Sequence, residues 1–227
     1  MTQFSDHIES IRANVAKCEG KSPNEEATKN WFVLPMLSAL GYEIFNPDEV
    51  LPEFTADVGT KKGEKVDYAI VLNGEILALI EVKAFDTDLS SQHYSQLYRY
   101  FAATPAPLAI LTNGVEYNFF SDSMTENKMD DEPFFVFNLL QHNRHSLEKF
   151  HNFSRNLVNK DQIVKEAYHN LCVSKIQQFL KDQAQQPSRE FVKTVTSQFF
   201  SKRYTDAAIE ELATMVQEAI TSFNPTK

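Results

Sequence analysis

Two apolar runs joined by an Asn-Gly pair occupy the middle of the chain, in the stretch VDYAIVLNGEILALIEVK at residues 66–83. Residues 69–72 and 76–80 are apolar without alternation, which predicts two β-strands that are covered on both faces. Asn73-Gly74 is typical of a tight turn between paired strands. We therefore expect a hairpin of two central strands, at residues 65–72 and 75–83.

Three ionisable residues lie within these expected strands, next to the apolar runs. Asp67 lies near the start of the first strand, and Glu81 and Lys83 lie near the end of the second. A charge that is buried without a partner is strongly unfavourable, so these residues require an ion, a partner or a function. Because alternate residues of a strand face the same side, Glu81 and Lys83 share one face.

The register of the hairpin decides whether Asp67 joins this pair. With a plain two-residue loop, Asp67 and Glu81 would face opposite sides of the hairpin. If Leu72 instead pairs with Ile76, or if a bulge gives the same parity, Asp67 lies directly across from Glu81, with Cβ atoms about 5 Å apart. We predict this second arrangement, because only it builds one site.

Two carboxylates at this spacing repel each other by about 1–4 kcal/mol unless a cation lies between them. Oxygen ligands without His or Cys favour Mg²⁺ or Mn²⁺, which keep several waters and accept phosphate oxygens. Such an ion lowers the pKa of a bound water and stabilises charge that develops on phosphorus. Lys83 would then hold the attacking water or stabilise the transition state.

The rest of the chain alternates helical and extended patterns. An amphipathic helix is indicated by Phe4, Ile8, Ile11 and Val15, and a second helix is expected from Pro23 to about Leu40. For this second helix we expect a capping box of Ser22 and Glu25, and a bend at Pro35. Residues 42–62 are expected to be extended and rich in loops.

After the hairpin, a helix is expected from Asp88 or Ser90 to about Phe101. Strands are then expected at residues 108–112 and 115–120, with an edge strand at 134–139. From about Ser146 only helical patterns follow. The expected fold is thus α/β, a mixed sheet flanked by helices in residues 1–145, with an all-helical C-terminal segment in residues 146–227.

Composition limits the function classes. The 227 residues are 42% hydrophobic and 23% charged, which is typical of a globular protein. The net charge of −9 argues against a wholly basic nucleic-acid binder. Cys18 and Cys172 have no zinc or disulfide spacing, and neither a membrane helix nor a signal peptide is indicated. We therefore predict a cytoplasmic protein that does not associate with membranes.

The ordered motifs resemble the PD-(D/E)XK nuclease superfamily, and more narrowly the N-terminal nuclease domain of type I restriction enzyme R (HsdR) subunits. The motifs that carry the resemblance are Glu25-Glu26-Ala27-Thr28-Lys29, Leu34-Pro35-Met36-Leu37, Leu40-Gly41-Tyr42, Asp67, Ile80-Glu81-Val82-Lys83, Gln96 with Tyr100, and Leu111-Thr112-Asn113-Gly114. They cover roughly residues 20–122, and the ordered set is more specific than any single motif.

The resemblance implies a restriction-endonuclease-like fold and a Mg²⁺-dependent DNA endonuclease in a restriction system. Asp67 and Glu81 would be metal ligands together with the Val82 carbonyl, and Lys83 would be the catalytic lysine. Glu25 would match the glutamate of the family's N-terminal helix, with Glu26 as an adjacent rival. Gln96 and Tyr100 would match its Q-x-x-x-Y motif, with DNA as the substrate.

Alternatives remain open at this point. No G-x-x-x-x-G-K-[ST] phosphate loop occurs, so the chain is either a stand-alone relative or works with other restriction-system subunits. The same scaffold could serve as an inactive binding or regulatory module. The helical C-terminal segment could also recruit partners or a second copy of the chain, and Asp67, Glu81 and Lys83 could form a purely structural ion pair.

Overall fold

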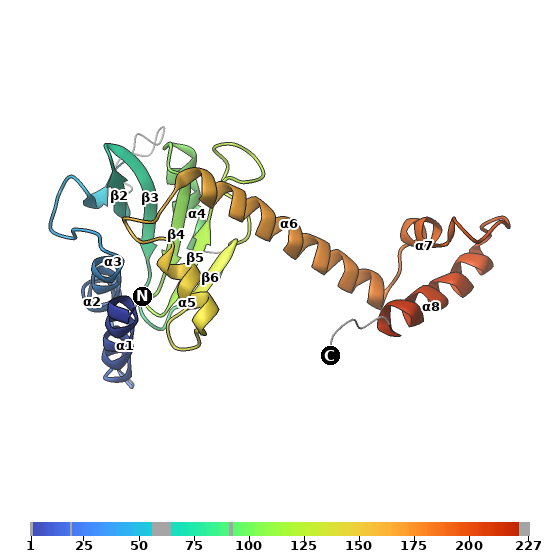
Figure 1. The fold of residues 1–227 in the computed structure, drawn as a ribbon, viewed down its shortest axis with the longest axis horizontal. Coiled ribbons are helices and arrows are strands. Elements are labelled where there is room, and N and C mark those ends of the chain that lie inside the picture. Colours follow the sequence, from blue (N-terminus) through green and yellow to red (C-terminus); the bar gives the residue numbers. More distant parts are fainter. Residues whose placement is uncertain (1, 19, 56–64, 91–92, 223–227) are drawn as a thin grey trace. The chain divides into compact units, whose positions relative to one another are not determined.

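The computed structural model describes residues 2–18, 20–55, 65–90 and 93–222. Within these residues the strands form a six-stranded sheet in which neighbours along the chain are also neighbours in space (Figure 1). The strands are β1 (Val50–Phe54), β2 (Val66–Leu72), β3 (Glu75–Val82), β4 (Leu108–Thr112), β5 (Glu116–Phe120) and β6 (Phe135–Asn138). Only β3 and β4 are parallel, and the other adjacent pairs are antiparallel. The predicted mixed α/β sheet is therefore confirmed.

The hairpin of β2 and β3 combines a two-residue turn with a bulge. Leu72 pairs with Glu75 around Asn73-Gly74, and both turn residues have positive φ. Between Val71 and Ile70 the register shifts by one residue, so that Tyr68 pairs with Ile80. The predicted parity is confirmed in its bulged form, whereas the three-residue loop is not formed.

β1 lies within the segment 42–62, which was expected to be extended and rich in loops. It is the edge strand of the sheet, where Pro52 is tolerated because its missing N–H interrupts no inner ladder. Glu53 has a φ of 51°, which interrupts the regular extended backbone. These two residues break the apolar alternation by which a strand is recognised.

The N-terminal helical segment consists of α2 (Glu25–Thr28), the π-helical turn η1 (Lys29–Val33) and α3 (Leu34–Ala39), which follow one another without a break. The N-cap is Asn24, whose side chain accepts a hydrogen bond from the Ala27 N–H at 2.9 Å. The predicted capping box of Ser22 and Glu25 is therefore wrong. Asn24 lies closer to the first helical turn and satisfies its free N–H groups.

A π-helical turn directly precedes the helix that contains Pro35, where the sequence predicted a bend. In this turn the Leu34 N–H donates to the carbonyl of Lys29, five residues earlier. A proline inside a helix lacks an N–H and crowds the carbonyl four residues before it, and the wider turn relieves that crowding. The turn also begins at Lys29, which contributes to the candidate site.

Helices cover both faces of the sheet, as the unalternated strands predicted. On one face the strands pack with α1 (Thr2–Ala16), the N-terminal helical segment, α5 (Arg144–His151) and the first half of α6 (Lys160–Gln185). On the other face they pack with α4 (Tyr94–Ala102), which connects the parallel strands β3 and β4 (Figure 1). All four apolar residues of the predicted first helix are buried.

By its internal packing the chain divides into two units, Met1–Leu171 and Cys172–Lys227. The sequence placed the boundary between residues 145 and 146 instead. The difference arises because Leu147, Phe150, Phe153, Ile163, Ala167 and Leu171 are buried in the same core as the sheet. Residues 146–171 hold the end of α5 and the first half of α6 and no strand, as expected, but they complete the first unit.

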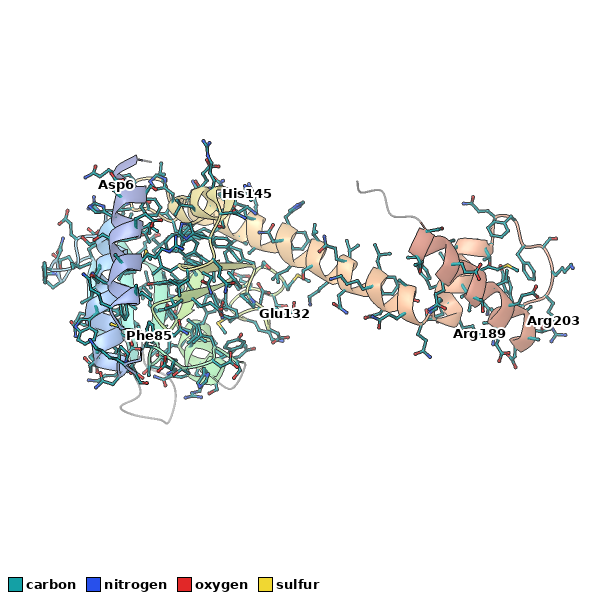
Figure 2. All side chains as sticks on the ribbon, turned by 90° about the horizontal axis from the view of Figure 1, so that it is seen from below. Asp6, Phe85, Glu132, His145, Arg189 and Arg203 are labelled. Carbon is teal, nitrogen blue, oxygen red and sulfur yellow. The ribbon has the colours of Figure 1, made fainter. Side chains whose placement is uncertain are left out.

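The second unit contains the end of α6, together with α7 (Arg189–Thr196) and α8 (Asp206–Ser222). Val192 and Thr196 on α7 and Leu212 and Val216 on α8 are buried, and the two helices contact each other. The side chain of Arg189, labelled in Figure 2, pairs with Asp206 at 2.5 Å. None of the helices among the described residues has the length and apolarity to cross a membrane.

Candidate metal-binding site on the central strands

The register of the hairpin brings Asp67 and Glu81 to one place. Continuing the pairing of Tyr68 with Ile80 by one residue sets Asp67 across from Glu81. By alternation both residues face the same side as Ala69 and Leu79, which belong to the core under α4. The two side chains are buried, with exposed fractions of 9% for Asp67 and 3% for Glu81.

Both oxygens of Asp67 accept hydrogen bonds from the protein. Oδ2 accepts from the Val82 N–H at 2.6 Å, and Oδ1 lies 2.5 Å from the Lys29 ammonium. The first contact ties β2 to the end of β3, and the second ties β2 to the N-terminal helical segment. Two short charge-assisted contacts fix the orientation of this carboxylate.

Glu81 is held by Lys83 on one oxygen only. Lys83 Nζ lies 2.5 Å from Glu81 Oε1, whereas Oε2 is buried without a hydrogen-bond partner. Burial raises the pKa of Glu81 to about 7, the hydrogen bond from Lys83 opposes this shift, and the negative charge of Asp67 adds to it. A buried oxygen without a partner is unfavourable, so Oε2 is suited to receive a ligand.

Lys29 is a residue of the site that the sequence did not single out. Its ammonium contacts Asp67 at 2.5 Å, Glu26 at 2.8 Å and Glu25 at 3.5 Å, and Glu53 lies 4.0 Å away. The pKa of Lys29 is raised above its ordinary value, because these hydrogen bonds and charges outweigh burial, which alone would lower it. The spacing Glu-Glu-x-x-Lys was the available signal, although on a helix it usually indicates an exposed ion pair.

Glu25 and Glu26 are both connected to the site by their ion pairs with Lys29. Glu26 makes the shorter contact but has a highly exposed side chain. Glu25 is less exposed, and its charge raises the pKa of Glu81. The structure thus connects both rivals to the site, and which of them serves it remains a prediction.

Gln96 and Tyr100 lie on α4, on the side of the sheet that Asp67 and Glu81 face. The Gln96 amide donates to the backbone carbonyl of Lys65 at 2.5 Å, which fastens α4 to the entry of β2. Tyr100 is buried in the core between α4 and the sheet. Their roles toward DNA, and that of the Val82 carbonyl as a ligand, stay predictions.

The Thr112-Asn113-Gly114 turn holds the end of β3 in position next to the site. The Lys83 N–H donates to the Thr112 carbonyl at 2.7 Å, which positions the end of β3. Asn113 accepts from the N–H groups of Val115 and Glu116, and its amide donates to the Thr87 carbonyl. The turn therefore holds the end of β3, which carries Glu81, and the residue that follows it, Lys83.

Gly114 lets this turn approach the N-terminal helical segment closely. It has a φ of +82°, and a Cβ at this position would lie 2.9 Å from Phe32 Cβ and 3.0 Å from Thr28 Cγ2. Phe32 in turn packs on Phe85, labelled in Figure 2, with ring centroids 5.4 Å apart. This close packing fixes the helix that carries Lys29.

The donor set fits a hard divalent cation. In the part of the chain that the structure describes, no group of three or more His, Cys, Asp and Glu side chains is placed to hold a metal. The site offers two carboxylates, and Mg²⁺ typically takes one or two carboxylates while keeping several waters. The free Oε2 of Glu81 is consistent with such a ligand set.

Fold and site together define an α/β protein with two buried carboxylates on adjacent central strands of a mixed sheet and a lysine directly after the second of these strands. Residues 24–132 match the family model described as type I restriction enzyme R protein N terminus (HSDR_N). No curated protein and no solved structure matches the chain. The matched segment begins at the N-cap Asn24 and includes every residue of the candidate site.

Proposed function

We propose that the protein is a metal-dependent DNA endonuclease that acts in a restriction system, in a role like that of type I R subunits. The observation that carries the proposal is the bulge in β3, which sets Asp67 and Glu81 across from each other beside Lys83. The family of residues 24–132 supports the restriction context and DNA as the substrate.

Asp67 and Glu81 would hold Mg²⁺ or Mn²⁺, with the Val82 carbonyl as a further ligand. When bound, the ion would polarise the phosphate and lower the pKa of a water. Glu81 keeps the Lys83 ammonium at the site through Oε1 and has Oε2 free for a ligand. Lys83 would hold the attacking water or stabilise the negative charge on the phosphate oxygens.

The net charge of −9 means that the protein as a whole repels a DNA backbone. Productive binding therefore depends on local contacts, on the metal, or on another subunit of the system. We also propose a cytoplasmic location, partner subunits of the restriction system, and association through the helical C-terminal segment.

The proposal is tested by measuring the rate at which the protein cleaves plasmid DNA and single-stranded DNA with Mg²⁺, with Mn²⁺ and with a chelator. Asp67→Ala, Glu81→Ala and Lys83→Ala should each lower the cleavage rate by about a hundredfold or more, because each removes a group of the reacting centre. Glu49→Gln is the matched control, since Glu49 is equally buried but pairs with Arg155. Undiminished cleavage by all three folded variants would refute the proposal.

A second candidate is a binding or regulatory module that keeps the scaffold without the chemistry. The ion pair of Lys29 with Asp67 favours it, because an ammonium can satisfy this carboxylate without a metal. DNA or protein binding that is indifferent to metal would support the module. Saturable Mn²⁺ binding that is lost in Asp67→Asn would support the enzyme.

A further inference from the structure

The Lys29 ammonium has more carboxylate neighbours than the Lys83 ammonium, the other cation of the site. Its side chain is almost fully buried, and carboxylates from three parts of the chain surround it. Asp67 comes from β2, Glu25 and Glu26 come from α2, and Glu53 comes from β1. An ammonium in such surroundings neutralises charge that would otherwise be repulsive.

The Lys29 ammonium lies 2.5 Å from Oδ1 of Asp67, the carboxylate that the proposed function assigns to a metal. The other oxygen of Asp67 already accepts the Val82 N–H at 2.6 Å. Asp67 therefore has no oxygen that is free of a protein donor, in contrast to Glu81.

We propose that Lys29 is a resident counter-ion of this site, which leaves Asp67 Oδ1 when a divalent cation binds and so sets the metal affinity. The inference rests on the proposed function, because it requires that Asp67 be a metal ligand. Lys29 acts here as a positioning residue: it holds Asp67 in its rotamer before the metal arrives.

The surroundings of Lys29 give the ammonium a place to go. Glu26 at 2.8 Å and Glu25 at 3.5 Å can keep it paired after it leaves Asp67, and Glu53 is near. These three side chains are more exposed than Asp67, so the displaced charge moves toward solvent. When a divalent ion takes the place of the ammonium, the negative charge of the buried Asp67 carboxylate stays neutralised.

The inference is tested by calorimetry, which measures the binding of Mn²⁺ to the metal-free full chain without DNA. Lys29→Gln should bind Mn²⁺ about tenfold tighter or more, because the ion no longer displaces a positive charge from Asp67. Lys29→Arg, which keeps the charge, should stay close to the wild-type affinity. Lys65→Gln is the matched control, since Lys65 pairs with Glu53 at 3.3 Å without contacting Asp67.

A second measurement uses the wild-type protein alone, so that it does not depend on the folding of a variant. In ¹⁵N-lysine-labelled protein, the ammonium of Lys29 should give a signal protected from solvent exchange, identified by its absence in Lys29→Arg. Addition of Mg²⁺ should shift this signal and reduce its protection. An unchanged signal at saturating Mg²⁺ would show that Lys29 stays on Asp67, and would overturn the inference.

The calorimetric outcomes separate this inference from the function beneath it. If the wild type binds Mn²⁺ and Lys29→Gln binds it equally or more weakly, Lys29 is not a competitor and only the inference fails. If neither protein takes up Mn²⁺, the proposed metal site itself fails, and the inference fails with it.

Discussion

Asp67 is the residue at which three elements of the first unit meet. Its carboxylate contacts the Val82 N–H on β3 and the Lys29 ammonium on η1, and it lies across from Glu81. Asp67 and Glu81 could be singled out from the sequence because a charge inside an apolar strand is conspicuous. Lys29 could not, because its burial depends on how the helix docks and not on local spacing.

At the same scale, Gly114 provides a sharp test of how the turn supports the site. Gly114→Ala should lower the free energy of unfolding by about 2–4 kcal/mol, because it combines a positive φ with a Cβ pressed against Phe32. Gly74→Ala is the matched control: its φ is +81°, but no atom lies within 4 Å, so it should cost only about 1 kcal/mol.

Urea denaturation of the two variants measures the difference directly. Equal losses of stability would mean that the turn does not press on the helix, and that it contributes little to holding the site.

At the scale of elements, the hairpin shows what sequence can and cannot determine. The requirement that Asp67 and Glu81 share a face predicted the parity of the two strands. It did not distinguish a three-residue loop from a two-residue loop with a bulge, since both give the same pairing near the site. That choice depends on the preference of Asn73-Gly74 for a tight turn with positive φ at both residues.

The start of the N-terminal helical segment gives a second test at this scale. Asn24→Ala should lower the free energy of unfolding by about 1 kcal/mol, because it removes the side-chain acceptor of the Ala27 N–H. Ser22→Ala should leave stability nearly unchanged, since the helix begins after it. Thermal denaturation compares the two variants, and a larger loss for Ser22→Ala would restore the capping box that the structure contradicts.

At the scale of the whole molecule, the sheet and its flanking helices were predictable, but the extent of the first unit was not. The strand patterns end near residue 145, and apolar periodicity shows that a later helix is amphipathic without showing what it covers. Phe150 and Phe153 in fact pack on Phe119 of β5, with ring centroids 5.9 Å and 4.4 Å apart.

Truncation therefore distinguishes the two boundaries. Residues 1–171 should fold cooperatively by themselves, whereas residues 1–145 should not. The shorter chain loses Leu147, Phe150, Phe153 and Ile163, each worth about 1.5–3 kcal/mol of burial. Their combined loss is comparable with the total stability of a typical domain, about 5–15 kcal/mol. Circular dichroism and urea denaturation of both chains check this, and a stable fold for residues 1–145 would contradict it.

The most direct test of the central claim is the anomalous diffraction of a crystal soaked in Mn²⁺. A peak from one ion or from a pair of ions is expected in contact with carboxylate oxygens of both Asp67 and Glu81, at roughly 2.0–2.3 Å, with the Lys29 ammonium moved away from Asp67. Diffraction at saturating Mn²⁺ that shows no peak between these two carboxylates, with Lys29 still on Asp67, would contradict it.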